Sequence, residues 1–215
     1  MKSEQENVWD EIAPLWNEYK IERVRGNKKT GLVDEFIDKK KDKKVLDLGC
    51  GSGRNFFKFD NSDGVIYGID FSKEMLKLAE KNAEKLRVKV ELIKSNIWDL
   101  PFENNFFDKV IFMATLHCIK DKEKRIKSLK EVYRVLKPKG KVLITIWNKS
   151  NKRWKNKNKE IKVGWNVKSK EKRVERDYYL YDYDELEKEL KETEFKIIKH
   201  NFIEGSRNII LIAEK

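Results

Sequence analysis

The sequence predicts an α/β protein with a mixed sheet of about seven strands, helices on both faces and a C-terminal antiparallel hairpin. First, an apolar segment runs into a glycine-rich turn in KVLDLGCGSGR, residues 44–54. Second, further apolar segments alternate with segments of helical periodicity, as parallel strands connected by helices do. Third, the last two apolar segments, FKIIKHNFIE and SRNIILIAE, are joined around Gly205 and Ser206, and such a short connection favours antiparallel pairing.

The N-terminal elements are predicted in chain order from periodicity and end signals. Apolar residues at helical spacing predict an amphipathic helix over residues 8–22. The first strand ends at the glycine-rich turn, and the second, VIYGID, ends at Asp70. Ser72 is a suitable cap for a helix that continues to about Leu86, with Glu74 in its first turn.

The later elements follow the same alternation. VKVELIKSN predicts a third strand that ends at Asn96, and the nearly all-apolar FDKVIFMATLH predicts a central fourth strand. A helix over residues 122–136 should end at KPKG, because Pro138 and Gly140 end helices and start turns. GKVLITIW, residues 140–147, predicts the fifth strand, and residues 183–190 predict the last helix.

The glycine-rich turn indicates a cofactor site. Gly49, Gly51 and Gly53 lie at alternate positions directly after the first strand, where glycine permits positive φ and a close approach of the backbone to a ligand. The G-x-G-x-G spacing differs from the G-x-G-x-x-G of dinucleotide folds, and the Lys and Ser/Thr of a phosphate-binding P-loop do not follow. This favours a cofactor without a pyrophosphate, although a glycine turn in a dinucleotide enzyme stays an alternative.

Two acidic residues flank the same predicted crevice. Asp47 lies near the end of the first strand, and Asp70, at the end of the second, is placed where a carboxylate can hold a ribose diol. With this loop and these acids, the segment resembles the class I S-adenosylmethionine-dependent methyltransferases, which have a Rossmann-like fold. The resemblance implies S-adenosylmethionine as cofactor, bound by Asp47, Gly49, Gly51, Gly53, Asp70, Phe71, Asn96, Ile97 and Met113.

Length and composition restrict the remaining possibilities. A chain of 215 residues predicts a single domain over residues 1–215, with a basic insertion at about 149–176. No long apolar segment is present and the N-terminus is polar, so we expect a cytoplasmic protein. The two Cys and two His residues are too isolated for a metal constellation, and no metal is predicted.

The basic insertion carries most of the net charge of +12, because residues 149–176 hold twelve Lys and Arg against three Glu. Trp154 and Trp165 are interleaved with these cations, a pattern that suits RNA with exposed bases. A solvated lid is the alternative. The residues expected to bind RNA are Lys152, Arg153, Trp154, Lys155, Trp165, Lys168, Lys170 and Arg173.

The methyl acceptor is narrowed by motifs that the sequence lacks. It contains no Asn/Asp-Pro-Pro-aromatic motif of amino-methyltransferases, and Cys118 is not in the setting of a cytosine C5 nucleophile. Oxygen, a small-molecule carbon or an unusual nucleic-acid group remain as acceptors.

Four segments resemble the family that methylates the carboxymethyl side chain of the wobble uridine in tRNA, a stand-alone enzyme in fungi that is fused to an AlkB-like oxygenase in animals. These segments are VWDEIAPLWNE, NIWDLPFENNFFDKVIFMATLHCI, GWNV and ERDYYLYDYDELEKEL. The resemblance implies tRNA as substrate and a small zinc-finger activator protein as partner. It also implies that the modified uridine is positioned by His117, Arg176, Tyr178 and Tyr181. Cys118, Tyr179 and Asn166 depart from the family pattern, so substrate details can differ.

The absence of an obvious general base fits a carboxylate acceptor, which is already ionised at neutral pH. A small-molecule methyltransferase, with the basic segment as a lid, stays open as an alternative. So does a non-catalytic RNA-binding subunit, although the intact loop and acids argue against it.

Overall fold

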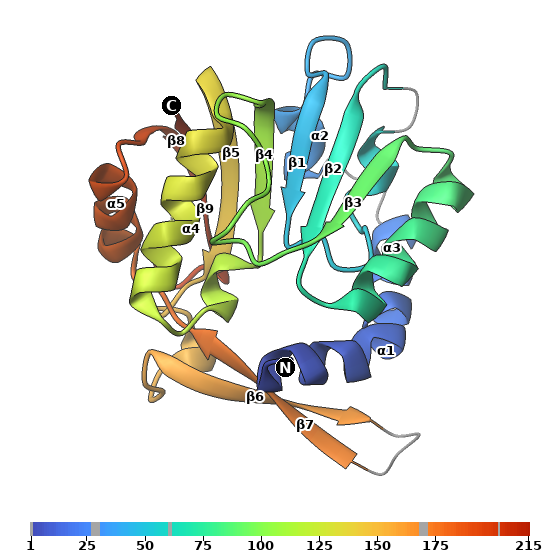
Figure 1. Ribbon diagram of the computed structural model, residues 1–215. Coiled ribbons are helices and arrows are strands. Elements are labelled where there is room, and N and C mark those ends of the chain that lie inside the picture. The colour runs from blue at the N-terminus through green and yellow to red at the C-terminus, as the bar shows by residue number, and fades with distance from the viewer. Residues whose placement is uncertain (1, 27–30, 60–61, 168–171, 202) are drawn as a thin grey trace. The chain divides into compact units, whose positions relative to one another are not determined.

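A computed structural model describes residues 2–26, 31–59, 62–167, 172–201 and 203–215 of the chain. Its main sheet has seven strands in the order β3-β2-β1-β4-β5-β9-β8 (Figure 1). The bounds are β1 (Lys44–Leu48), β2 (Val65–Asp70), β3 (Val90–Lys94), β4 (Phe107–Met113), β5 (Leu136–Trp147), β8 (Lys196–His200) and β9 (Asn208–Glu214). β9 pairs antiparallel with both β5 and β8, whereas β1, β2 and β3 pair parallel, as do β4 and β5. The predicted mixed sheet with its C-terminal antiparallel hairpin is therefore confirmed.

The chain divides into two compact units, which are described separately. The first comprises Met1–Asn96 and Gly164–Arg176, and the second comprises Ile97–Val163 and Asp177–Lys215.

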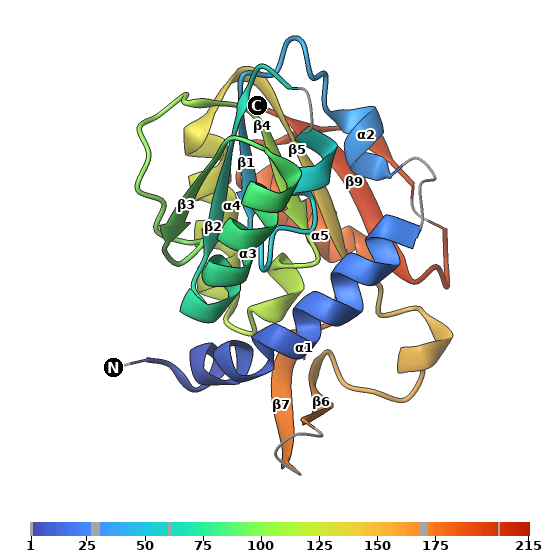
Figure 2. The ribbon, with the colours of Figure 1, turned by 90° about the vertical axis from the view of Figure 1, so that its right-hand side faces the viewer.

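In the first unit, α1 (Glu4–Gly26) packs against α3 (Lys73–Leu86), as Figures 1 and 2 show. α1 is longer at both ends than the predicted helix over residues 8–22, and it accommodates Pro14 in its interior. The predicted cap of α3 is confirmed, because the Ser72 hydroxyl accepts a hydrogen bond from the Met75 amide at 3.1 Å. Two short elements were not predicted, α2 (Leu32–Phe36) and the 3₁₀ turn Phe56–Phe59.

In the second unit, α4 (Lys122–Val135) packs against β5, and α5 (Tyr183–Glu192) packs against both α4 and β8. Asp121 caps α4 by accepting a hydrogen bond from the Lys124 amide at 3.1 Å. The predicted fourth strand ends earlier than its apolar letters suggested, at Met113, and a 3₁₀ turn over Leu116–Cys118 carries His117.

The helix α4 ends at Val135, within one residue of the prediction. The predicted start of the fifth strand at Gly140 is wrong, because β5 already begins at Leu136. Leu136 pairs with Phe107, and the regular register resumes only where Lys141 pairs with Lys109. The residues of KPKG therefore form an irregularity within the strand. Gly140 is needed there because a Cβ at this position would lie 2.7 Å from the carbonyl oxygen of Lys137.

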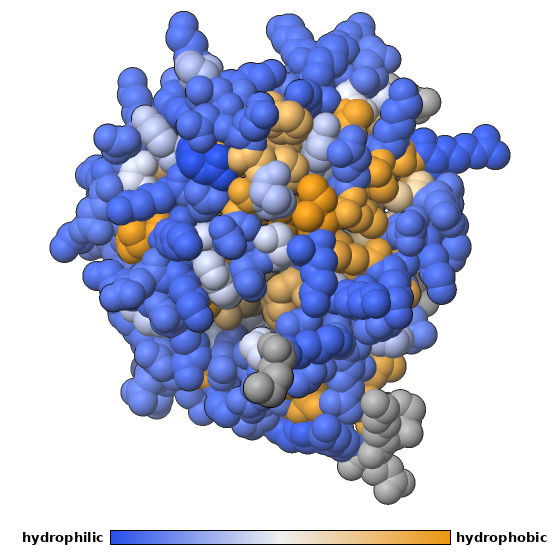
Figure 3. Space-filling model, in the orientation of Figure 1, coloured by the Kyte–Doolittle hydropathy of each residue, from blue (hydrophilic) through white to orange (hydrophobic). Residues whose placement is uncertain are grey.

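The basic insertion contains regular structure. A 3₁₀ turn (Lys152–Trp154) is followed by β6 (Glu160–Val167) and β7 (Lys172–Tyr179), which form a second, two-stranded sheet. These two strands were not predicted from the sequence. The surface in Figure 3 is mostly hydrophilic, as the charged fraction of 40% leads one to expect.

Candidate active site

The glycine-rich turn after β1 has the strained backbone that its sequence predicts. Gly49, Gly51 and Gly53 have φ values of +72°, +54° and +79°, in the left-handed region that favours glycine. The amides of Gly49 and Cys50 donate hydrogen bonds to the carbonyl oxygen of Ile69, at 2.8 and 2.9 Å. The turn is thereby fixed to the end of β2.

Asp70 lies at the end of β2 against this turn. One carboxylate oxygen accepts a hydrogen bond from the Gly51 amide and the other from the Ser72 amide, both at 2.9 Å. Burial raises the pKa of Asp70 to about 6, against the opposing effect of these hydrogen bonds. Each carboxylate oxygen can accept a second hydrogen bond, so Asp70 is able to bind hydroxyl groups of a ligand.

Asp47 is the second buried acid of the first unit. It lies in β1 with 1% of its surface exposed, and the Asn55 side-chain amide donates to its two oxygens at 3.0 and 3.2 Å. Burial raises the pKa of Asp47 to about 7, and the nearby charge of Asp70 contributes to the increase. A positively charged ligand would stabilise the ionised form of these two buried carboxyls.

The loop and the acids fit S-adenosylmethionine, which carries a sulfonium cation and a ribose diol. A Cβ added to Gly51 would meet just the Met75 sulfur within 4 Å, at 3.9 Å, so this side of the turn is open to a ligand. In contrast, a Cβ at Gly53 would lie 2.5 Å from the Phe56 ring. Gly53 is therefore needed for packing within the protein, and Gly51 is suited to face the ligand.

Comparison with known proteins supports the same assignment. Residues 39–196 match the family model described as "Methyltransferase domain". The chain belongs to the methyltransferase family. Its fold is shared with a solved S-adenosylmethionine-dependent methyltransferase of Methanosarcina mazei, with a TM-score of 0.71 and 21% identity, covering 86% of this chain and 97% of that one. S-adenosylmethionine is its cofactor.

The curated relatives are methyltransferases with different substrates. The chain is 28% identical over 190 residues to a protein of Encephalitozoon cuniculi named as a methyltransferase, covering 84% of each. It is 28% identical over 161 residues to a protein of Mus musculus named "Probable tRNA methyltransferase 9B", covering 74% of this chain and 33% of that one. It is 33% identical over 153 residues to demethylmenaquinone methyltransferase of Bacillus mycoides, covering 66% of this chain and 62% of that one.

The other predicted cofactor residues of this methyltransferase are divided between the two units. Phe71 is half-buried and Asn96 is exposed in the first unit, whereas Ile97 is buried and Met113 is half-buried in the second. Their contacts with S-adenosylmethionine stay predictions.

A connection between α1 and the cofactor loop was missed from the sequence. Asp10 accepts hydrogen bonds from the Ser72 hydroxyl at 2.6 Å and from the Glu74 amide at 3.2 Å. The Asn82 side chain donates to both the Asn17 side chain and the Ser52 carbonyl oxygen, each at 2.8 Å. The sequence predicts Ser72 as a helix cap, and Asp10 lies in the segment VWDEIAPLWNE that carries the family resemblance. No pattern indicates that the two side chains form a hydrogen bond.

Arg176, predicted to position the substrate, is buried in the first unit with 4% of its surface exposed. Its guanidinium carbon lies 5.5, 5.2 and 5.1 Å from the ring centroids of Trp9, Trp16 and Trp165. These are cation–π distances, and a desolvated guanidinium benefits most from such contacts. We call Arg176 with Trp9, Trp16 and Trp165 the tryptophan cage.

His117 and Tyr178, also predicted substrate residues, are 1% and 2% exposed in an aromatic stack of the second unit. The Trp147 ring centroid lies 4.9 Å from that of His117 and 4.3 Å from that of Tyr178. Trp154 stacks on Trp147 at 5.2 Å and is buried. The expectation that Trp154 stacks on an RNA base is therefore corrected, because its ring is used in the interior.

The prediction that Tyr181 touches the substrate is also corrected. Its side chain is fully buried, and its hydroxyl donates to a carboxylate oxygen of Glu189 at 2.8 Å. Burial raises the pKa of Tyr181 well above its usual value. Arg125 contacts the same network, 3.6 Å from Glu189 and with its guanidinium over the Tyr179 ring. Tyr181 therefore stabilises the packing of α4 and α5.

The predicted RNA-binding residues have different surroundings. Lys152, Arg153, Lys155 and Arg173 are exposed, as RNA contacts require. Trp165 is half-buried and packs in the tryptophan cage. Lys168 and Lys170 lie outside the described residues.

None of the helices in the described residues combines the length and apolar character needed to cross a membrane. No group of three or more His, Cys, Asp or Glu side chains in this part of the chain is arranged to hold a metal ion.

Proposed function

We propose that this methyltransferase esterifies the carboxymethyl group of a modified wobble uridine in tRNA, converting 5-carboxymethyluridine to 5-methoxycarbonylmethyluridine. The proposal rests chiefly on the charge of residues 149–176, which hold twelve Lys and Arg against three Glu. A relative named as a tRNA methyltransferase matches 74% of the chain. The net charge of +12 and the exposed Lys152, Arg153 and Lys155 support an anionic nucleic-acid substrate.

The cofactor supplies an electrophilic methyl group on a sulfonium. In the proposed reaction a carboxylate oxygen of the substrate forms the new bond to this methyl as the sulfur–methyl bond breaks, leaving S-adenosylhomocysteine. An ionised carboxylate has no proton to lose, so no general base is needed. The protein must hold the two groups in line and exclude water, which can contribute about 7–11 kcal/mol in favourable systems.

The residues have separate parts in this proposal. Asp70 holds the ribose hydroxyls, Asp47 offers negative charge near the cationic cofactor, and Gly51, where a side chain is absent, lets the ligand approach the turn closely. Arg176 and His117 are buried and do not touch the substrate directly; they act as positioning residues through the aromatic rings that they contact, Arg176 in the tryptophan cage and His117 beside Trp147. The proposal also includes a cytoplasmic location and a small zinc-finger activator as partner.

A second candidate function is methylation of a small quinone-like molecule. The 33% identity to a demethylmenaquinone methyltransferase is higher than the identity to the tRNA relative, and this observation favours it. In this case the basic segment serves as a lid over the substrate and not as an RNA-binding surface.

The two functions are separated by assaying labelled methyl transfer to each acceptor. tRNA bearing 5-carboxymethyluridine and a demethylmenaquinone are incubated separately with the protein and labelled S-adenosylmethionine, with and without a zinc-finger activator. We expect mass spectrometry of the digested tRNA to show a labelled methyl ester on the uridine. Labelled quinone together with unmodified tRNA would reject the proposal in favour of the second candidate.

A further inference from the structure

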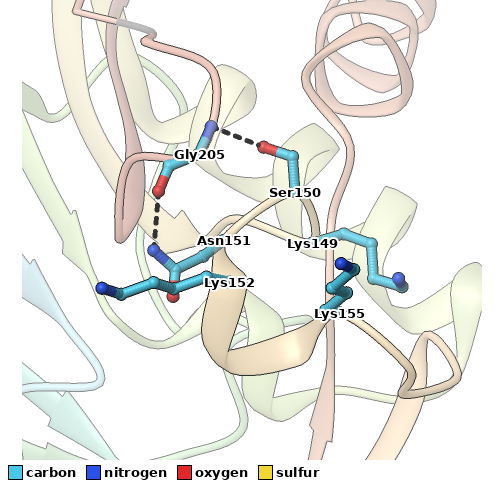
Figure 4. A pocket seen from close by; sticks show the side chains of 6 residues that line it. All are labelled: Lys149, Ser150, Asn151, Lys152, Lys155 and Gly205. Carbon is cyan, nitrogen blue, oxygen red and sulfur yellow. Dashed lines mark hydrogen bonds between the residues drawn. The ribbon is translucent and has the colours of Figure 1, made fainter.

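A lysine-lined pocket lies in the second unit, and none of the residues assigned to the cofactor lines it. It has a volume of about 650 Å³ and opens between the segment after β5 and the connection of β8 to β9 (Figure 4). It is lined by Lys149, Ser150, Asn151, Lys152, Lys155 and Gly205.

Hydrogen bonds fix the shape of this pocket. The Asn151 side chain donates to the Gly205 carbonyl oxygen at 2.7 Å, and the Gly205 amide donates to the Ser150 hydroxyl at 3.0 Å, as Figure 4 shows. The Ser150 hydroxyl in turn donates to Asn148 at 2.9 Å. Below the turn, the buried Trp154 ring stacks on Trp147. The lysines are therefore attached to a well-anchored backbone, which reduces the entropy lost on binding a ligand.

The positive charge of the pocket is not balanced by acidic residues among the parts of the chain that the structure describes. Residues 149–159 contain six Lys and Arg and no Asp or Glu. Among the described residues, Lys149, Lys152 and Lys155 form no ion pair. By contrast, Lys159 pairs with Asp182 and Glu185, at 2.7 and 2.8 Å. A cationic pocket of this kind attracts an anionic ligand.

The directions of the lysines favour an extended anion. In Figure 4 the side chains of Lys149 and Lys155 extend to one side of the turn, and that of Lys152 extends to the other. A single small anion is bound best by cations that converge on one point. Cations that diverge along a groove match a chain of separated negative charges, and lysine binds phosphate as a compact point charge.

We propose that this pocket binds consecutive backbone phosphates of the RNA substrate, with Lys149, Lys152 and Lys155 as the phosphate contacts. This inference rests on the proposed tRNA function and deepens it, because it assigns a footprint to the substrate. Exposed Arg153, whose guanidinium lies 4.5 Å from the Trp154 ring centroid, borders the same turn. The buried Trp154 supports the turn, and the phosphates are bound by the charges above it.

The test compares two triple variants of the full chain. Lys149→Gln, Lys152→Gln and Lys155→Gln together remove three pocket charges, and Lys122→Gln, Lys127→Gln and Lys130→Gln remove three exposed charges from α4. Binding of fluorescently labelled, unfractionated tRNA is measured by anisotropy over a series of NaCl concentrations. We expect the pocket variant to bind at least about tenfold more weakly near 0.1 M salt, with the slope of log K against log salt reduced by about two to three. The α4 variant should keep nearly the full slope.

Further measurements keep the outcomes distinct. Calorimetric binding of S-adenosylmethionine to each variant shows whether the variant is folded. If the triple variant is unfolded, the single variant Lys152→Gln replaces it, and the slope of log K against log salt should then fall by about one. A pocket variant with the wild-type slope, or an α4 variant that loses as much, would overturn the phosphate pocket. If the pocket variant loses its slope while the wild type never methylates 5-carboxymethyluridine, the proposed function fails and the phosphate pocket stands.

Discussion

At the scale of single residues, the two buried acids are the groups whose charge state should control cofactor binding. Their pKa values, about 6 for Asp70 and about 7 for Asp47, lie above the value near 4 of an unfolded chain. Between about pH 4 and pH 7 the folded protein without ligand therefore binds more protons than the unfolded chain. The contribution of these carboxyls to the free energy of unfolding falls as the pH rises through their folded pKa values.

We expect the affinity for S-adenosylmethionine to change in the opposite direction. A cationic ligand favours the ionised carboxylates, so affinity should rise from about pH 5.5 to about pH 8, by up to about tenfold per pH unit for each proton released. Equilibrium dialysis across this range measures it, and Asp70→Asn should flatten the curve. A wild-type affinity that is constant or falls with pH would show that these carboxyls do not face the cofactor.

A variant of Tyr181 can distinguish a role in packing from a role in substrate binding. Tyr181→Phe removes the donor to buried Glu189, and we expect a loss of about 1–3 kcal/mol in the free energy of unfolding, measured by urea denaturation. The control is Tyr133→Phe, at a ring that packs edge to face on Phe195 at 5.2 Å. Unchanged stability with a raised KM for tRNA would restore Tyr181 as a substrate contact.

The residues of the candidate site were predictable to different degrees. Gly49, Gly51 and Asp70 were predictable because backbone strain and strand-end position have direct sequence signals. The burial of Arg176 was not, since a cation is ordinarily expected at the surface and two tryptophans of its cage, Trp9 and Trp16, lie in α1, far away in the sequence. The bond between Asp10 and Ser72 was missed for the same reason, because it joins residues 62 positions apart.

At the scale of elements, α1 is connected to the cofactor loop region by the polar contacts of Asp10 and Asn17. Asp10→Ala removes the acceptor for Ser72 and Glu74, and we expect faster hydrogen exchange in α1, by about tenfold, and weaker binding of S-adenosylmethionine. Exchange mass spectrometry with and without cofactor measures both effects. Glu18→Gln, at an exposed position of α1, is the control. Equal exchange in both variants would mean that the bond to Ser72 does not anchor the helix.

The β7 strand shows why the strands of the basic segment were not predicted from the sequence. Along β7 the buried positions alternate as Val174, Arg176 and Tyr178, which is strand periodicity. A cation at the middle buried position disguises the alternation, and the many lysines around it suggest solvated chain. A similar difficulty arises at KPKG, whose residues predict a turn. They lie inside β5, because the strand tolerates a local irregularity in its pairing with β4.

At the scale of the whole molecule, the mixed sheet of seven strands with its central fourth strand and C-terminal hairpin was predictable from the alternation of apolar segments and helices. The substrate was harder to predict. Relatives with tRNA and quinone names match the chain with similar coverage, so the cofactor half does not discriminate between them. A binding test can use the charge of residues 149–159, because RNA and a quinone differ in charge.

The central claim is that the glycine-rich turn and its two buried acids bind S-adenosylmethionine, and calorimetric titration tests it most directly. We expect saturable binding of one cofactor per chain for the wild type, and binding at least about tenfold weaker for Asp70→Ala, a loss of about 1.4 kcal/mol or more. Asp63→Ala, at an exposed acid that pairs with Lys43, should bind like the wild type. A wild type that binds no cofactor, or an Asp70→Ala variant that binds it equally well, would contradict the claim.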